Sequence, residues 1–161
     1  TSSGAVTRNA DVLTYGSVTW DKTQGAAYME FSTMNAVRPN GQIASAIDGA
    51  STYFGIIGGG GSFTAYDGTT FAGAGAAMAA NTTYKGAVGW GPGSGAGKFS
   101  LVRSGDVLAT YSFDGDMGAT GSATLNIGNF GGRSQLNGCI RNFRLYGAPR
   151  IPDAQLTAMA T

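Results

Sequence analysis

The chain has 161 residues, a formal net charge of +1, and charged side chains at only 12% of its positions. So sparse and balanced a charge excludes a general nucleic-acid binder and a protein held on a membrane surface by basic residues. The absence of histidine and the presence of one cysteine, Cys139, exclude a zinc cluster, an intramolecular disulfide and hydrolases with a histidine base. Cys139 is predicted to be a small buried apolar residue.

Apolar and polar residues alternate with a period of two along most of the chain, which predicts many short β-strands in a sandwich or barrel. In residues 26–32, Tyr28 and Glu30 fall on one face, while Met29 and Phe31 fall on the other. The predicted strands, in chain order, are 26–32, 42–47, 52–57, 62–66, 69–72, 82–90, 98–103, 107–113, 123–127 and 136–146.

Glycine-rich segments and turn signals separate these strands. The Asp67-Gly68 pair predicts a tight hairpin, and Ser104-Gly105-Asp106 predicts a second one. Residues 73–80 are expected to form a loop or an edge segment, because they combine two glycines with no polar face. A short helix is expected near 152–160, where a proline occupies a first-turn position. The sequence thus predicts ten to twelve strands and one C-terminal helix, all in a single domain over 1–161.

The second half of the chain resembles laminin-G-like, concanavalin A-like domains. Residues 98–110 (KFSLVRSGDVLAT) are similar to a hairpin of that family. Residues 125–128 (LNIG), 136–146 (LNGCIRNFRLY) and 151–156 (IPDAQL) are similar to its closing strands and short helix. The resemblance implies an all-β, two-sheet antiparallel jelly-roll sandwich. From the residues themselves, we expect Leu156 and Met159 to let the C-terminal helix cap an open end of the sandwich.

The first half of the chain resembles the opening of such domains in phage and prophage structural proteins, on residues 7–12 and 27–31. This implies a component of a tail, a fibre or a head appendage, made in the host cytoplasm and exposed on the surface of the virion. It also implies contacts with other virion proteins. Many small residues and little charge are consistent with a homo-oligomer, and no apolar run is long enough to enter a bilayer.

An enzyme that cleaves polysaccharide would need a suitable pair of carboxylates. Retaining glycosidases need two of them about 5 Å apart across the scissile bond. Glu30 is the only glutamate and has no carboxylate within two residues on either side. Asp114 and Asp116 are the nearest candidates for an inverting pair, but aspartates in a glycine-rich loop usually form turns. We therefore expect no enzymatic activity.

A calcium ion is the one metal that the resemblance brings into question. Laminin-G-like domains often hold Ca²⁺ at the rim of the sandwich through Asp, Asn and backbone oxygens. The oxygen donors in corresponding loops are Asp114, Asp116 and Asn129. No other cofactor is expected.

Sugar recognition requires flat aromatic faces and polar groups for the hydroxyls. Trp90 is the strongest aromatic candidate because it lies where a strand enters a long glycine-rich loop. For every aromatic residue in the chain, however, burial in the core is the more common role. The full set of candidates is Trp90, Tyr53, Tyr66, Asp67, Asn129 and Arg133.

Residues 133–150 contain four arginines and no acid. Two interpretations remain open: outward positions on a strand and its flanking loops, or a site for an anion or an acidic sugar. The arginines are Arg133, Arg141, Arg144 and Arg150.

Together these features favour a non-catalytic domain that binds host-surface carbohydrate on a phage-like particle. The first alternative is a purely structural decoration or fibre domain that assembles with virion proteins. The second alternative is an enzyme that degrades polysaccharide.

Overall fold

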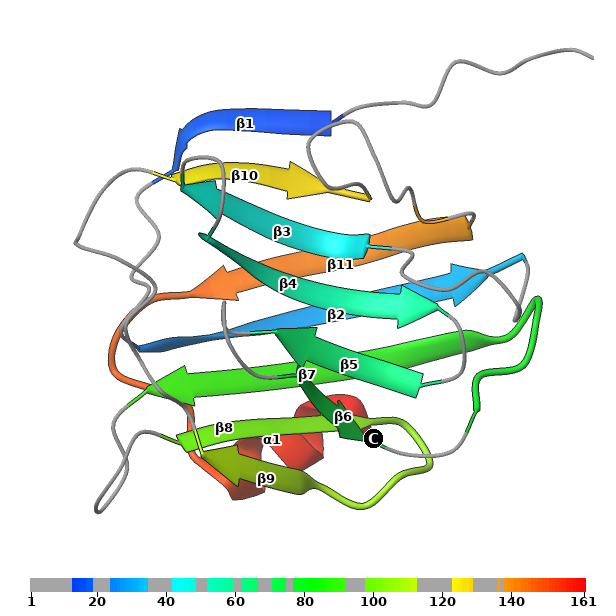
Figure 1. Cartoon of the computed structure of the whole chain (residues 1–161). Helices are drawn as coiled ribbons and strands as arrows, with labels where there is room; N and C mark the ends of the chain where they lie inside the picture. The colour runs from blue at the N-terminus through cyan, green and yellow to red at the C-terminus, as the bar shows by residue number, and fades with distance from the viewer. Residues whose placement is uncertain are drawn as a thin grey trace, which may run out of the picture.

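The computed structural model describes residues 13–18, 24–34, 42–48, 52–59, 62–66, 71–74, 77–91, 98–112, 123–128, 136 and 138–161. Within these ranges the chain forms eleven strands and one helix, which confirms the expected number and order of elements (Figure 1). The strands are β1 (Leu13–Val18), β2 (Gly25–Thr33), β3 (Gln42–Asp48), β4 (Thr52–Gly59), β5 (Ser62–Tyr66), β6 (Phe71–Ala74), β7 (Thr83–Gly91), β8 (Lys98–Arg103), β9 (Ala109–Ser112), β10 (Ala123–Ile127) and β11 (Gly138–Tyr146), and the helix is α1 (Asp153–Ala160).

The strands form two antiparallel sheets. One has six strands in the order β1-β10-β3-β4-β5-β6, and the other has five in the order β11-β2-β7-β8-β9. The sheets lie face to face, so the predicted jelly-roll sandwich is confirmed (Figure 1). At one side of the sandwich the Tyr111 hydroxyl of β9 donates a hydrogen bond to the Gly73 carbonyl of β6, which links the two sheets.

The main core lies between the sheets, and it follows from the alternation in β2. Met29 and Phe31 point inward and are fully buried, whereas Tyr28 and Glu30 lie on the outer face. The ring of Phe31 stacks on Phe63 of the opposite sheet, with 5.6 Å between the ring centroids. The two faces predicted for residues 26–32 are therefore confirmed.

The helix α1 packs on the outer face of the five-stranded sheet, so the prediction that it caps an open end is wrong. Its buried residues Leu156 and Ala160 join Ala87 and Val102 in a second apolar cluster. The cause is the small size of the outward residues of β7. A Cβ atom on Gly89 would lie 2.7 Å from Leu156 Cδ1, so a larger residue there would force the Leu156 side chain to shift.

Three local expectations also need correction. Cys139 is exposed, because Ile140 packs against the core and Cys139 alternates to the outer face of β11. Val107 lies before β9 rather than within a strand and is 88% exposed. Residues 13–18 form a strand, β1, that is not among the predicted ones. In the described part of the chain no helix is both long and apolar enough to span a bilayer.

Candidate functional site

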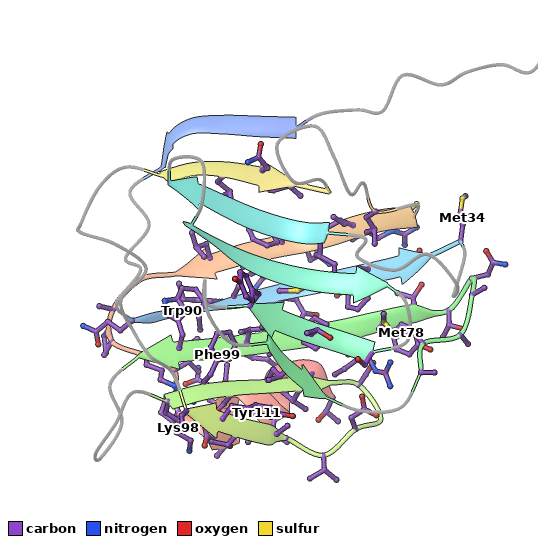
Figure 2. The ribbon with its side chains drawn as sticks, in the orientation of Figure 1. Met34, Met78, Trp90, Lys98, Phe99 and Tyr111 are labelled. Carbon is purple, nitrogen blue, oxygen red and sulfur yellow. The ribbon has the colours of Figure 1, made fainter. Side chains whose placement is uncertain are left out.

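Trp90, the strongest predicted sugar contact, is a core residue. Its side chain is 1% exposed and lies across Gly25 of β2, where an added Cβ would meet the indole at 2.7 Å. Figure 2 shows Trp90 and Phe99 among the side chains that fill the space between the sheets. The indole has no free face on which a sugar ring could stack.

Of the other predicted site residues, the structure describes only Tyr66 and the strand position of Tyr53. Tyr66 is partly buried at the end of β5, and Tyr53 belongs to β4, with its side chain outside what the structure describes. The remaining candidates for sugar or calcium lie outside the described residues: Asp67, Asp114, Asp116, Asn129 and Arg133. Among the residues that are described, no group of three or more Asp, Glu, Cys or His side chains could hold a metal ion.

A polar groove of about 220 Å³ opens on the outer face of the five-stranded sheet, beside the helix. We call it the β2–β11 groove. It is lined by Tyr28, Glu30, Asn142, Arg144, Tyr146 and Met159. Five of these side chains come from the two neighbouring strands, and Met159 comes from α1.

The register of β11 against β2 builds this groove. Arg141 pairs with Glu30, and Arg144 pairs with Tyr28. Only Met29 separates the two partners on β2, while two residues separate the arginines on β11, so β11 contains a bulge. In a regular strand, residues three positions apart would point to opposite faces. The bulge brings both arginines to the outer face.

Asn142 occupies the bulge with a left-handed backbone conformation, φ 49°. Asparagine tolerates this region better than most residues. Its side chain donates a hydrogen bond to Glu30. The bulge therefore adds an amide to the outer face as well as aligning the arginines.

Glu30 and Tyr28 form the polar centre of the groove, with the Tyr28 hydroxyl donating to Glu30 Oε1 at 2.9 Å. Hydrogen bonds from Asn142 and Tyr28, together with the charges of Lys85 and Arg141, lower the pKa of Glu30. Burial, and then the hydrogen bond to Glu30, raise the pKa of Tyr28. At neutral pH Glu30 is a carboxylate and Tyr28 keeps its proton.

These protonation states suit binding rather than bond cleavage. Among the described residues that line the groove, Glu30 is the one carboxylate, and because its pKa is lowered it is a poor general acid. The protonated Tyr28 is a poor nucleophile. Arg144 is exposed, and no described carboxylate forms an ion pair with it. Its guanidinium can therefore take a carboxylate from a ligand in a bidentate pair.

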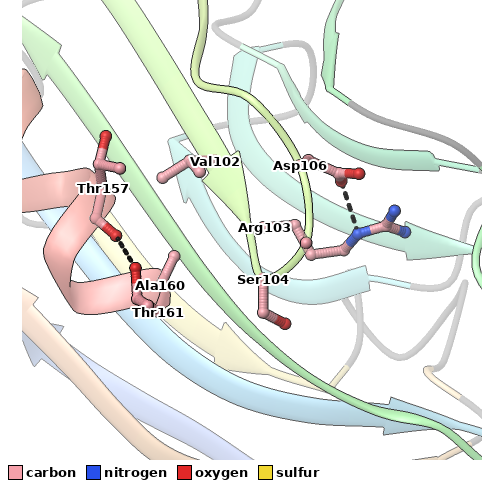
Figure 3. Close-up of a pocket in the computed structure, with 8 residues that line it drawn as sticks. Val102, Arg103, Ser104, Asp106, Thr157, Ala160 and Thr161 are labelled. Atoms are coloured by element: carbon pink, nitrogen blue, oxygen red, sulfur yellow. Dashed lines mark hydrogen bonds and ion pairs between the residues drawn. The ribbon is translucent and has the colours of Figure 1, made fainter.

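A second cavity, of about 130 Å³, lies between the β8–β9 turn and the end of α1 (Figure 3). The Arg103 side chain is 4% exposed, and Figure 3 shows its guanidinium directed at Asp106 and away from Thr157 of the helix. Arg103 Nε lies 2.7 Å from Asp106 Oδ2, close enough for a strong Coulombic attraction, although the angle does not make a hydrogen bond. The guanidinium also lies over the Tyr84 ring, 4.6 Å from its centroid. Because Arg103 is engaged in this way, we regard the β2–β11 groove as the candidate site.

The N-terminal end of α1, opposite the end that carries Met159, is held by charged side chains. Asp153 accepts hydrogen bonds from Lys98 and, at 2.6 Å, from Arg150, which also donates to the Ser100 hydroxyl. Partial burial by itself would raise the pKa of Asp153, but the hydrogen bonds from Lys98, Arg150 and Ser100 outweigh it and hold the pKa at about 2. Asp153 is therefore a carboxylate throughout the physiological range.

No protein-family model matches this sequence, and no curated protein matches it either. Solved structures do match. They include the CBM40 carbohydrate-binding module of a Ruminococcus gnavus IT-sialidase bound to α2,3-sialyllactose, with a TM-score of 0.66 at 14% identity over 87% of this chain and 85% of that one. A second structure of the same module gives a TM-score of 0.65 at 18% identity, over 86% of this chain and 83% of that one. Its complex with α2,6-sialyllactose gives 0.61 at 16% identity, over 87% and 85%.

At these identities the likeness shows a shared fold. The neighbours are non-catalytic modules with the jelly-roll sandwich that the sequence predicted. The arginine-rich segment had signalled part of the groove, since Arg144 lies in it. The alternation of β2 had placed Tyr28 and Glu30 on one outward face, but no signal in the sequence joined that face to β11.

Proposed function

We propose that this domain binds carbohydrate without cleaving it, and that the β2–β11 groove is its binding site. The observation that carries the proposal is the exposed Arg144, which pairs with Tyr28 across the two strands and lines the same groove as Tyr28 and Tyr146. The tyrosine rings offer apolar faces to a pyranose, and Glu30 and Asn142 offer partners for hydroxyls. The groove volume of about 220 Å³ suits one sugar ring more closely than an extended chain.

The proposed ligand is an acidic sugar whose carboxylate pairs with Arg144. An arginine and a carboxylate form two parallel, charge-assisted hydrogen bonds, a contact that a neutral sugar cannot make. The structural neighbours support this ligand class, because two of them were determined with sialyllactose, which carries a carboxylate. This is also the acidic-sugar interpretation of the arginine-rich segment.

The test compares two arginines on the same face. Sialyllactose and lactose are titrated by calorimetry or NMR into the wild type, Arg144→Gln and Arg141→Gln. We expect the wild type to bind sialyllactose with a dissociation constant of roughly 1 mM, and Arg144→Gln to bind about tenfold more weakly. Arg141 does not line the groove, so its variant should lose much less. Equal binding of sialyllactose and lactose by all three proteins would disprove the assignment.

We propose further that the glycan belongs to a host surface and that the domain is displayed, in several copies, on a phage-like particle. The similarity of residues 7–12 and 27–31 to the opening of such domains in phage structural proteins supports this setting. The solution mass of the protein tests self-association. If neither the monomer nor a multimer retains any glycan, the domain is better explained as a structural decoration or fibre component.

A further inference from the structure

Helix α1 forms one wall of the β2–β11 groove through Met159. The helix depends on its contacts with the sheet, because an isolated helix of this length would not be stable. It has only eight residues, and no side chain caps its N-terminus. A helix this short is marginal in water, so its position depends on what it packs against. Leu156 and Ala160 supply the apolar contact with the sheet, and Met159 lines the groove from the same helix.

The polar part of that attachment lies at the opposite end of the helix from Met159. Asp153 at the first helical position receives Lys98 from β8 and Arg150 from the segment that leads into the helix. Arg150 reaches β8 as well, through the buried Ser100. A carboxylate in the first turn is also favoured by the helix dipole. These contacts fix the helix N-terminus over β8.

We infer that Asp153 is a positioning residue for the groove and acts through the helix on Met159. Without its charge, the N-terminal end of α1 loses its ion pairs, whereas Leu156, Ala160 and the hydrogen bond from Lys85 Nζ to the Thr161 carbonyl still hold the rest of the helix, which can pivot about these contacts on the small residues beneath it. Met159 packs beside Tyr146 in the same cluster, so a shift of the helix changes the width of the groove. This inference rests on the proposed binding site and names a residue outside it that sets its shape.

The experiment is a double-mutant cycle with Asp153→Asn, Met159→Ala and the double variant, using the sialyllactose dissociation constant. Asp153→Asn should weaken binding by roughly threefold to tenfold, although Asp153 does not line the groove. In the Met159→Ala background the same change should have little further effect. Additive losses would show that Asp153 does not act through Met159, and would overturn the inference.

Two matched controls separate positioning from general loss of stability. Gln155→Ala changes an exposed residue of the same helix. Ile43→Val removes one methyl group from a buried residue of the six-stranded sheet, in the core between the two sheets. Neither should alter the dissociation constant. If Ile43→Val weakens binding as much as Asp153→Asn at a similar melting temperature, the effect is not positioning.

A second measurement does not depend on sugar. The methyl resonance of Met159, assigned from its absence in a Met159→Leu variant, should shift in Asp153→Asn and remain in place in both controls. An unchanged resonance in a folded Asp153→Asn protein would overturn the inference even if glycan binding is confirmed. A shifted resonance in a protein whose wild type binds no sugar would instead refute the proposed function, and the binding role of Asp153 with it.

Discussion

Asn142 combines a left-handed backbone with a hydrogen bond to Glu30, and two substitutions separate these roles. Asn142→Ala should reduce stability by about 1 kcal/mol, because alanine tolerates a positive φ poorly. Asn142→Gly should remain close to wild type in urea unfolding. Both variants lose the amide, so an NMR titration should show a higher pKa for Glu30 in each. An unchanged pKa would mean that the amide does not hold the carboxylate.

Gly86 lies on the inner face of β7 beneath two aromatic rings. A Cβ there would lie 2.7 Å from Phe63 Cζ and 3.3 Å from Phe31 Cε1. Both rings are fully buried and cannot move without disturbing the core. Gly86→Ala should therefore destabilise the domain by roughly 1–3 kcal/mol in urea unfolding. Gly147→Ala is the matched control, since nothing lies within 4 Å of the added methyl group, and it should be nearly neutral. Equal stability of the two variants would contradict this packing.

Cys139 should react with a thiol reagent in the native state, because it is exposed on the outer face of an edge strand. Labelling should be about as fast in buffer as in denaturant. Replacement by serine should change the unfolding free energy by less than about 0.5 kcal/mol, as is usual for a surface site. Protection of the thiol until unfolding would restore the original expectation of a buried cysteine.

At the scale of elements, the attachment of α1 predicts a pH dependence of stability. The folded pKa of Asp153 is about 2, below its ordinary value of 3.8. A lowered carboxyl pKa contributes stability that is present above the unfolded pKa and is lost as the pH falls through the folded one. Above pH 4 we expect the free energy of unfolding of the wild type to exceed that of Asp153→Asn by about 1 kcal/mol. This figure allows for solvent screening of a partly exposed group.

The difference between the two proteins should then shrink between pH 4 and pH 2, when measured by urea unfolding at each pH. Other carboxylates titrate in the same range, but they are common to both proteins and cancel in the comparison. A difference that stays constant down to pH 2 would show that Asp153 is not held as a carboxylate by its neighbours.

The sequence predicts an element correctly where one face of that element is buried and the other faces solvent. β2 alternates in this way, and α1 follows a proline with apolar residues at helical spacing. β1 was not recognised because a glycine interrupts its short alternation. The alternation along β7 also indicates that Trp90 is buried, because Trp90 lies on the same face as Val88 and Gly86. Its position before a glycine-rich loop outweighed that signal.

The candidate site is harder to predict from the sequence than the strands and the helix, for a physical reason. The groove depends on pairing between β2 and β11, which are distant in sequence, and on a bulge that shifts their register. Local periodicity determines which face a residue occupies within its own strand, but not which strand lies beside it. The arginine-rich segment and the outward face of β2 could each be recognised. Only the fold joins them.

At the scale of the whole molecule, the proposed binding site is one shallow groove, so we expect each copy to bind weakly. Several copies on one scaffold raise the effective concentration and can increase the overall affinity roughly 10²- to 10⁴-fold without new contacts. A small net charge of +1 allows copies to lie close together without strong repulsion. We expect a tetramer on a streptavidin scaffold to be retained on sialylated cells from which the monomer washes off. Arg144→Gln should abolish the retention, and equal retention of both tetramers would place the site elsewhere.

The position of β2 between β7 and β11 has a consequence for the synthesis of the protein. Roughly a hundred residues separate the end of β2 from the start of β11. At the usual rate of translation, their synthesis takes roughly 5 to 20 seconds. During this interval one edge of β2 has no strand beside it, and unpaired edges are templates for aggregation. A ribosome that stalls before Gly138 would release a chain with this edge permanently open, so the yield of the domain depends on uninterrupted synthesis of its last strand.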